Sequence, residues 1–186
     1  MSDPKAQAVV SNGPSRATGV EHEEAVFACL LITFRRLRSA LDRKEAIGAI
    51  ADTLETLVGS DEFAIYGLNA DGDELELIAA FGGLPPSIAT IPCSDGVVGS
   101  CIARGELMVP AAAADCPVLP GGKTLRALVP LTLGGLPFGA IAVFRLLEQK
   151  DGVFDEMDLD LFNLLKTEAA MALNATRRRE ARVETS

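Results

Sequence analysis

The sequence contains a single histidine, His22, and no Cys-x-x-Cys pair among its four cysteines. Structural metal sites in proteins combine cysteine and histidine ligands at short, regular spacings. We therefore expect no metal site. The cysteines also lack a regular spacing, so we expect no structural disulfide and a protein whose thiols stay reduced, as they do in the cytoplasm.

Long apolar runs are missing as well. The longest uninterrupted run, AVFACLLI at residues 25–32, is far shorter than the roughly 20 residues needed to span a bilayer. The opening MSDPKAQAVVSNG lacks the apolar centre of a signal peptide. These absences predict a soluble, cytoplasmic protein that does not insert into a membrane.

Basic residues are outnumbered, because 17 lysines and arginines face 26 aspartates and glutamates, which gives a net charge of −9. The basic residues gather at 35–44 and 177–182 instead of forming a broad stripe. A nucleic-acid footprint needs such a stripe. We expect no nucleic-acid partner.

One glycine-rich stretch, CSDGVVGSCIARG at residues 93–105, could suggest a phosphate cradle or a thiol redox pair. It matches neither GxxxxGK[ST] nor GxGxxG, the spacings that hold phosphates. The simplest interpretation is structural: Gly96 and Gly99 are turn and close-packing glycines that lead into a short helix, with Ser94 or Asp95 as its cap.

The chain divides into four segments. Residues 1–19 mix small and polar types without periodicity, which predicts a flexible tail. Residues 20–41 predict a helix with glutamates at its start and arginines at its end, and its apolar residues occupy too many faces for one partner. We expect this helix to mediate dimerisation. Residues 42–176 form the domain proper, and 177–186 a charged C-terminal tail.

Within the domain, Asp42 and Glu45 predict a helix N-terminus, and an apolar repeat continues to Gly59. Two alternating runs joined at Asp71-Gly72 predict a first hairpin, and a second hairpin is expected to turn at Gly134-Gly135. Pro130 lies inside the second hairpin, which suggests a bulge or a locally unpaired position there.

The region 82–124 between the hairpins predicts only short elements, namely strands near 88–92 and 107–109 and a helix near 97–104. A long helix from about Asp155 closes the chain. The fold class is therefore α+β: an antiparallel sheet with the terminal helices packed on one face and this irregular crossover, with its short helices, on the other.

Three segments resemble the GAF domain, a ligand-binding sensory module related to PAS domains. They are the helix and strand from ALDRKEAIGAIADTLETLVG onward, the turn and helix GVVGSCIARGELMVP, and the ending VPLTLGGLPFGAIAVF followed by FDEMDLDLFNLLKTEAAMAL. The resemblance covers about Asp42 to Ala175. It implies a small pocket between the sheet and the crossover, and terminal helices that commonly pair across a dimer.

The resemblance also allows the family's known ligands to be tested. Cyclic-nucleotide-binding members carry an Asn-Lys pair, which is missing here. Bilin-bearing members use a cysteine usually followed by histidine, and haem-bearing members need an axial histidine, whereas His22 lies outside the resembling region. We expect no cofactor.

What remains is a generic ligand pocket. Its candidates are polar or aromatic residues on elements expected to face the crossover: Tyr66, Phe81, Cys101, Asp115 and Arg126. Each has a structural alternative: Tyr66 and Phe81 as core residues, Asp115 as a turn cap, and Arg126 on the outer sheet face or in a surface ion pair.

One GAF-related enzyme family, the free methionine-(R)-sulfoxide reductases, uses cysteines of the crossover. In that family a cysteine stands inside the GVxG turn, where this sequence has Val98. The spacing also differs. We therefore expect Cys93, Cys101 and Cys116 to be packing residues, since free cysteine is common in cores.

Three functions are weighed from these observations. The first is a non-catalytic, homodimeric small-molecule sensor or adaptor, which would pass its signal to a separate protein because no output domain accompanies the module in this sequence. The second is an interaction scaffold whose pocket is vestigial. The third is a thiol enzyme like the free methionine-(R)-sulfoxide reductases.

Overall fold

A computed structural model describes residues 17–94, 96–150 and 152–184 of the chain. Its helices are α1 (Ala17–Ser39), α2 (Arg43–Thr53), α3 (Gly96–Arg104) and α4 (Glu156–Glu184). The main sheet contains β1 (Ser60–Leu68), β2 (Glu74–Phe81), β3 (Thr90–Pro92), β6 (Ala127–Leu133) and β7 (Leu136–Leu146). A small hairpin of β4 (Val118–Leu119) and β5 (Lys123–Thr124) lies in the crossover, and single turns of π or 3₁₀ helix fill the gaps at 54–58, 86–88, 113–115 and 148–150.

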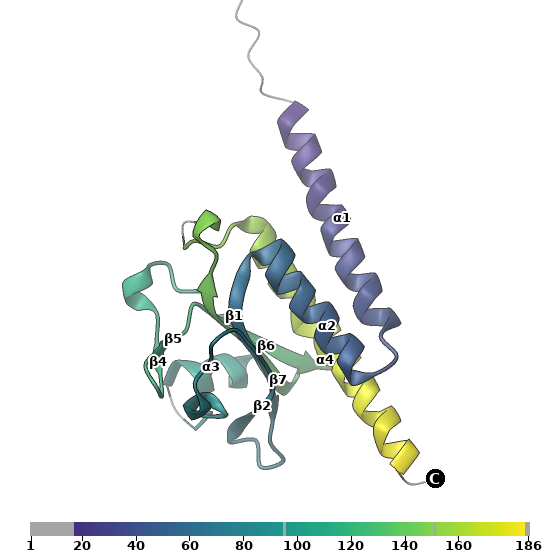
Figure 1. Cartoon of the computed structure of the whole chain (residues 1–186), viewed down its shortest axis with the longest axis vertical. Helices are drawn as coiled ribbons and strands as arrows, with labels where there is room; N and C mark the ends of the chain where they lie inside the picture. Colours follow the sequence, from purple (N-terminus) through teal and green to yellow (C-terminus); the bar gives the residue numbers. More distant parts are fainter. Residues whose placement is uncertain (1–16, 95, 151, 185–186) are drawn as a thin grey trace, which may run out of the picture.

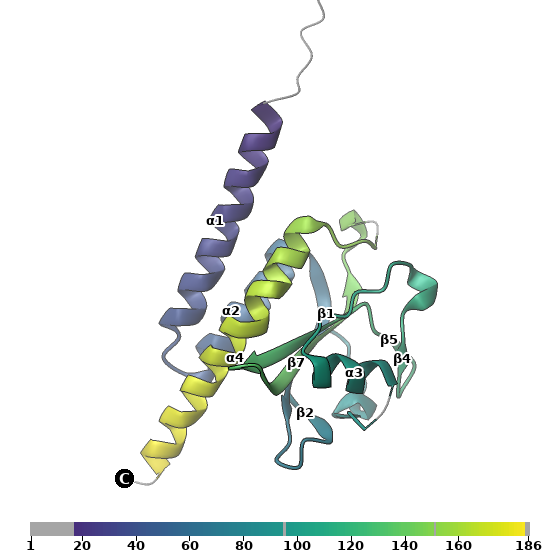
Figure 2. The same cartoon turned by 180° about the vertical axis from the view of Figure 1, so that it is seen from behind.

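The main sheet is antiparallel throughout, in the order β3-β2-β1-β7-β6. Helices α1, α2 and α4 form a layer on one side of it, and α3 lies on the other side with the β4–β5 hairpin (Figures 1 and 2). The α+β class and the placement of the two layers are confirmed.

Local sequence signals explain where the elements begin and end. The Asp42 carboxylate accepts a hydrogen bond from the Glu45 amide at 2.8 Å, and the Glu45 carboxylate accepts one from the Leu41 amide at 2.7 Å. These two bonds satisfy amides that a helix start otherwise leaves unpaired. The same run ends at Gly59, whose φ of 73° is the left-handed conformation that glycine adopts most readily.

The first hairpin forms as predicted, but its connection is longer than two residues. Asn69 organises the loop, because its side-chain oxygen accepts hydrogen bonds from the amides of Gly72, Asp73 and Glu74. This side chain adds to the backbone hydrogen bonds that close the loop, from the Asn69 amide to the Glu74 carbonyl and from the Gly72 amide to the Asn69 carbonyl.

Pro130 lies in a paired position, opposite Ala140, and the irregularity of β6 comes after it, between Leu131 and Thr132. The strand tolerates proline because β6 lies at one end of the sheet order. Leu128 exchanges both its backbone hydrogen bonds with Met108, on the side away from β7. Alternate residues of a strand direct their backbone N–H groups to the same side, so an N–H at position 130 would also point away from β7. Proline, which has no N–H, therefore costs the β6–β7 pairing no hydrogen bond.

Two apolar clusters fill the two sides of the sheet. The larger, on the helix side, includes Leu37, Ile50, Phe63, Ile141 and Phe162, all essentially inaccessible to solvent. The smaller one, on the crossover side, is described below. Because the residues of β1 alternate between the clusters, this central strand is buried on both faces.

The terminal helices differ in extent from the ranges predicted for them. Helix α1 begins at Ala17 and ends at Ser39, and residues 1–16 of the predicted tail lie outside the described residues. Helix α4 continues to Glu184, through most of the range predicted as a charged tail. The N-terminal half of α1 extends beyond the rest of the domain (Figure 1). No helix in the described part of the chain combines the length and apolar character needed to cross a membrane.

Candidate functional site

The space between the sheet and the crossover is filled by side chains. This crossover cluster consists of buried residues, with Tyr66 at its centre. The Tyr66 hydroxyl donates a hydrogen bond to the Ile88 carbonyl at 2.9 Å, and burial raises the pKa of the phenol. Tyr66 therefore ties β1 to the crossover backbone, and its hydroxyl is already engaged inside the protein.

A cleft of about 450 Å³ opens on the outer side of α3. Its lining includes Val97, Cys101, Arg104 and Met108. Val97 is half-exposed, and Arg104 is paired at 3.8 Å with Glu106, which also lines the cleft. The cleft therefore offers an apolar surface with an ion pair beside it, a mixture that is common in small-molecule sites.

The start of α3 explains the glycine-rich stretch. Gly96 has a φ of 77°, and a Cβ added at Gly99 would lie 2.4 Å from the carbonyl oxygen of Cys93. The structural interpretation of both glycines is confirmed, while Asp95, one of the two expected caps, lies outside the described residues.

The thiols on this side of the sheet are held in their protonated form. Burial raises the pKa of Cys101 to about 11, and its Sγ donates to the carbonyl oxygen of Glu106 at 2.9 Å. Burial also raises the pKa of Cys93, and the carboxylates of Asp73 and Glu74 add to that effect. Thiolate, the reactive form of cysteine, is disfavoured at both positions.

A second cavity, of about 440 Å³, lies at the other end of the crossover. Arg126 and Cys116 line it together with Phe154 from the segment before α4. The Arg126 guanidinium donates a hydrogen bond to the Gly152 carbonyl, which fixes it against that segment.

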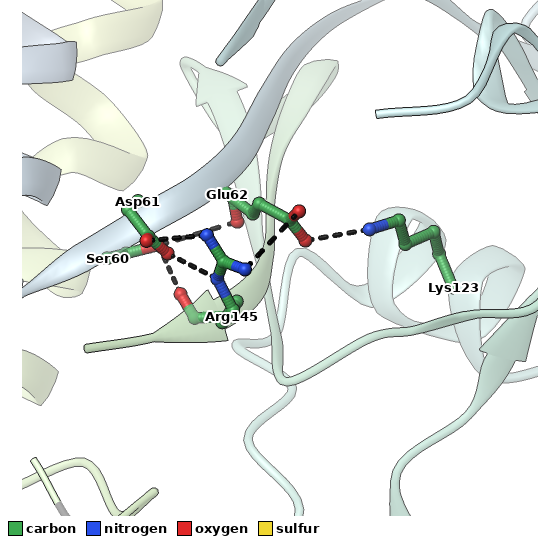
Figure 3. Close-up of polar contacts among 5 residues, drawn as sticks. All are labelled: Ser60, Asp61, Glu62, Lys123 and Arg145. Atoms are coloured by element: carbon green, nitrogen blue, oxygen red, sulfur yellow. Dashed lines mark hydrogen bonds and ion pairs between the residues drawn. The ribbon is translucent and has the colours of Figure 1, made fainter. Parts of the chain in front are cut away.

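An ion network joins the sheet to the β4–β5 hairpin (Figure 3). Arg145 makes a two-point contact with Asp61, at 2.7 and 2.6 Å, which lowers the pKa of that carboxyl. The neighbouring Glu62, only 8% exposed, pairs with Lys123 at 2.8 Å. A Cβ at Gly82 would lie 2.5 Å from the Asp61 carbonyl oxygen, so only glycine allows the backbone at position 82 to approach β1 this closely. The network fastens the crossover to β1, and all of its charges are engaged with one another.

The five predicted site residues do not form one site. Tyr66 and Cys101 belong to the crossover cluster, and Arg126 lines the second cavity. Asp115 is exposed on the 3₁₀ turn at 113–115. Phe81 was expected to face the crossover but lies on the opposite side of the sheet, where its ring stacks on Phe63 at 4.6 Å.

The helix layer has an exposed apolar surface on α1. The only sequence feature that indicated it is the apolar pattern of residues 25–41. Thr33 and Leu37 of α1, and Ala40 just after it, are buried on the side where α1 packs against α2 and α4. Residues 27–34 of the helix expose large apolar side chains, which we call the α1 apolar face: Phe27 (68% exposed), Leu31 (36%), Ile32 (56%) and Phe34 (37%). Contiguous exposed apolar surface of this kind usually marks an interface.

The described residues contain no candidate metal site. No group of three or more histidine, cysteine, aspartate or glutamate side chains lies close enough together there to hold an ion. All four cysteines are free thiols.

Solved structures of similar fold include GAF domains, a fragment of a chemotaxis protein and free methionine-R-sulfoxide reductases. The GAF domain of an Acinetobacter phosphoenolpyruvate-protein phosphotransferase is 19% identical, with a TM-score of 0.64 over 82% of this chain and 94% of that one. A fragment of a methyl-accepting chemotaxis protein is 17% identical, with a TM-score of 0.59 over 81% of this chain and 98% of that one. The free methionine-R-sulfoxide reductase of Neisseria meningitidis, solved with its substrate, is 24% identical, with a TM-score of 0.58 over 89% and 95%.

These identities show the shared fold alone. A comparison with curated protein sequences gave no match. The family comparison is more specific, because it matches residues 40–174, most of the chain, to the GAF domain. Together with the antiparallel sheet, its crossover and its helix layer, this match shows that the chain belongs to the GAF domain family.

Proposed function

We propose that this protein is a non-catalytic regulatory GAF module that acts as a homodimer through its helix layer and passes its signal to a separate partner protein. The observation that carries the proposal is the α1 apolar face, where Phe27 and Ile32 are more than half exposed. A second copy would remove this surface from water, which is the main favourable term in protein association.

The packing of the crossover side supports an adaptor more than a sensor with an enclosed ligand. Tyr66 fills the centre of that side, and its hydroxyl is bonded to Ile88. A ligand there would have to displace buried side chains. The open cleft beside α3, with Val97 and Arg104, is the better candidate for a small molecule.

The state of the thiols supports a non-catalytic role. Val98 occupies the turn position that carries a cysteine in the free methionine-(R)-sulfoxide reductases, and Cys101 is held as a buried thiol. A redox enzyme needs an accessible thiolate. The cytoplasm is the compartment we propose, supported by four free cysteines.

Analytical ultracentrifugation of the purified chain tests the dimer. We expect a dimer at micromolar concentration, and about 100-fold weaker association for Ile32→Glu, because burying an unpaired charge costs about 3 kcal/mol. Val118→Glu is the matched control, since Val118 is also more than half exposed (67%, against 56% for Ile32) but lies in β4, outside the helix layer. A wild-type monomer at these concentrations would contradict the proposal.

Native mass spectrometry of the same preparation distinguishes an adaptor from a sensor. An adaptor gives the mass of two bare chains, whereas a retained small molecule adds mass to each copy. If a molecule is retained and Val97→Asp abolishes its binding, the α3 cleft is a sensory site and the adaptor interpretation is wrong.

A further inference from the structure

The second cavity, of about 440 Å³, lies apart from the other surfaces considered for binding. Three stretches of chain line it: residues 109–112, Cys116 with Arg126, and residues 152–154. It shares no lining residue with the α3 cleft and none with the α1 apolar face. Its volume falls within the roughly 300–1,000 Å³ that small-molecule sites occupy.

Contacts within the protein hold the walls of this cavity in place. The Phe154 ring packs edge-on against Phe162, with 5.2 Å between the ring centroids. The turn before Cys116 is closed by a hydrogen bond from the Asp115 amide to the Ala112 carbonyl at 3.0 Å. Walls that are already positioned need little ordering when a ligand binds, which favours affinity.

Arg126 is the one charged side chain among the described residues that line the cavity. Its backbone amide donates to the Val143 carbonyl at 2.8 Å, and its guanidinium donates to the Gly152 carbonyl. Within the described residues, no carboxylate forms an ion pair with it. A guanidinium presents several N–H donors in a planar fork, which fits a carboxylate at two points. The cavity therefore offers a positioned cation to an acidic ligand.

Most of the remaining lining is apolar or small. Val153 is 67% exposed although its side chain is apolar, and it lines the cavity together with Phe154. Ala111 and Ala112 add little bulk to the opposite wall. A ligand with a hydrocarbon or aromatic body would cover Val153 and remove it from water. Inorganic phosphate has no apolar part that could do the same.

We propose that the second cavity binds a small monocarboxylate: its carboxylate pairs with Arg126, and its apolar body lies against Val153 and Phe154. The site goes beyond the proposed function and rests neither on the dimer nor on the α3 cleft. Residues 152–154 lead into α4, so a bound carboxylate connects the crossover to the start of the helix layer.

Isothermal titration calorimetry of the full-length protein tests the site with benzoate and hexanoate, each beside its uncharged amide, and with inorganic phosphate. We expect a dissociation constant of about 1 mM or below for at least one carboxylate, and binding at least 10-fold weaker for its amide and for phosphate. Arg126→Gln should weaken carboxylate binding at least 10-fold. Arg104→Gln is the matched control, because it removes the same charge from the α3 cleft and should leave binding unchanged.

Cys116 reports where the ligand binds, because its free thiol lines the cavity. A saturating carboxylate should slow the alkylation of Cys116 by iodoacetamide several-fold, as measured by peptide mass spectrometry, and leave Cys29 of α1 unchanged. Ala112→Leu adds an apolar side chain to the wall without changing the charge, and it should abolish binding while the melting temperature is retained. This variant keeps the test decisive if Arg126→Gln fails to fold.

Asp151 precedes Gly152 in the sequence and lies outside the described residues, so Asp151→Asn is measured as well. Binding in this variant alone would mean that the chain itself neutralises Arg126, and it overturns the proposal. The same holds for equal affinities toward carboxylate and amide, for loss of binding in Arg104→Gln, and for a lack of binding of either carboxylate at about 10 mM. None of these outcomes bears on the dimer, which analytical ultracentrifugation of the same protein reports separately.

Discussion

The thiol of Cys101 should be nearly inert toward a disulfide reagent such as dithionitrobenzoate in the native protein. Its Sγ is buried and donates to the Glu106 carbonyl at 2.9 Å, and its pKa is raised to about 11. At pH 8 about 0.1% of such a group is thiolate, against about a quarter of a free cysteine with a pKa of about 8.5. The difference predicts a reaction at least 200-fold slower than in the unfolded chain, before steric protection is added.

The assay follows the labelling of each cysteine over time by peptide mass spectrometry, with the protein in 6 M guanidinium chloride as the reference state. Cys93 should also be slowed, because burial raises its pKa. A parallel assay measures methionine sulfoxide reduction with a thiol reductant, for which we expect no turnover. Native labelling of Cys101 within 10-fold of the reference rate, or turnover that Cys93→Ala/Cys101→Ala removes, would refute both the packing role of these cysteines and the non-catalytic proposal.

Three further predictions concern stability and are read from urea unfolding curves. Tyr66→Phe should lower the free energy of unfolding by about 1–2 kcal/mol, because it leaves a buried carbonyl without its donor; an unchanged midpoint would mean that water replaces the hydroxyl. Gly139→Ala should lower it by about 2 kcal/mol or more, because the new Cβ would lie 2.1 Å from the Tyr66 carbonyl oxygen. Gly48→Ala, in an open helical position, is its control and should raise stability by up to about 1 kcal/mol; equal effects at both sites would contradict the steric argument. Asp158→Ala should lower it by about 3 kcal/mol, because it removes the fully buried carboxylate that accepts from Lys150 at 2.9 Å; a loss below about 1 kcal/mol would show that this pair contributes little.

Most of the fold could be predicted from signals within a few residues of each helix or strand end. The Asp42 and Glu45 pair marked the start of α2, and Gly59 marked the end of the helical run that follows it, because capping and left-handed backbone depend on residues within a few positions. The alternating runs predicted both hairpins for the same reason. The hydrophobic pattern of residues 25–41 likewise indicated a helix with more apolar surface than one partner could cover. The structure agrees, because α1 leaves Phe27 and Ile32 exposed.

Phe81 shows where local reasoning fails. Tyr66 pairs with Leu77 but Ile65 pairs with Ala79, so Ile78 is an extra residue in β2. One inserted residue moves every later side chain to the other face of a sheet, because the side-chain period of a strand is two. Without the bulge Phe81 would share the crossover side with Leu75, as the alternation predicted. Nothing in the letters ELELIAAF marks where the extra residue falls.

The contacts between distant segments could not be predicted either. Glu62 and Lys123 are 61 residues apart, and Arg179 bonds the carbonyls of Ala40 and Leu41 across the whole domain. Their pairing depends on tertiary packing, which brings together charges that look solvated in the sequence. The two basic clusters seemed separate for that reason, although Arg179 joins the last turns of α4 to the segment before α2 in the folded chain.

Both open ends of the sheet carry a proline, and this has a consequence for how copies can associate. At one end β3 has only three residues and finishes at Pro92, and at the other β6 presents Pro130, whose missing N–H lies on the outer edge. Proline on an edge strand blocks the backbone ladder that an incoming chain would need. The protein should therefore resist domain swapping and fibre growth through its sheet when it is concentrated, which leaves side-chain contacts as the means by which copies recognise each other.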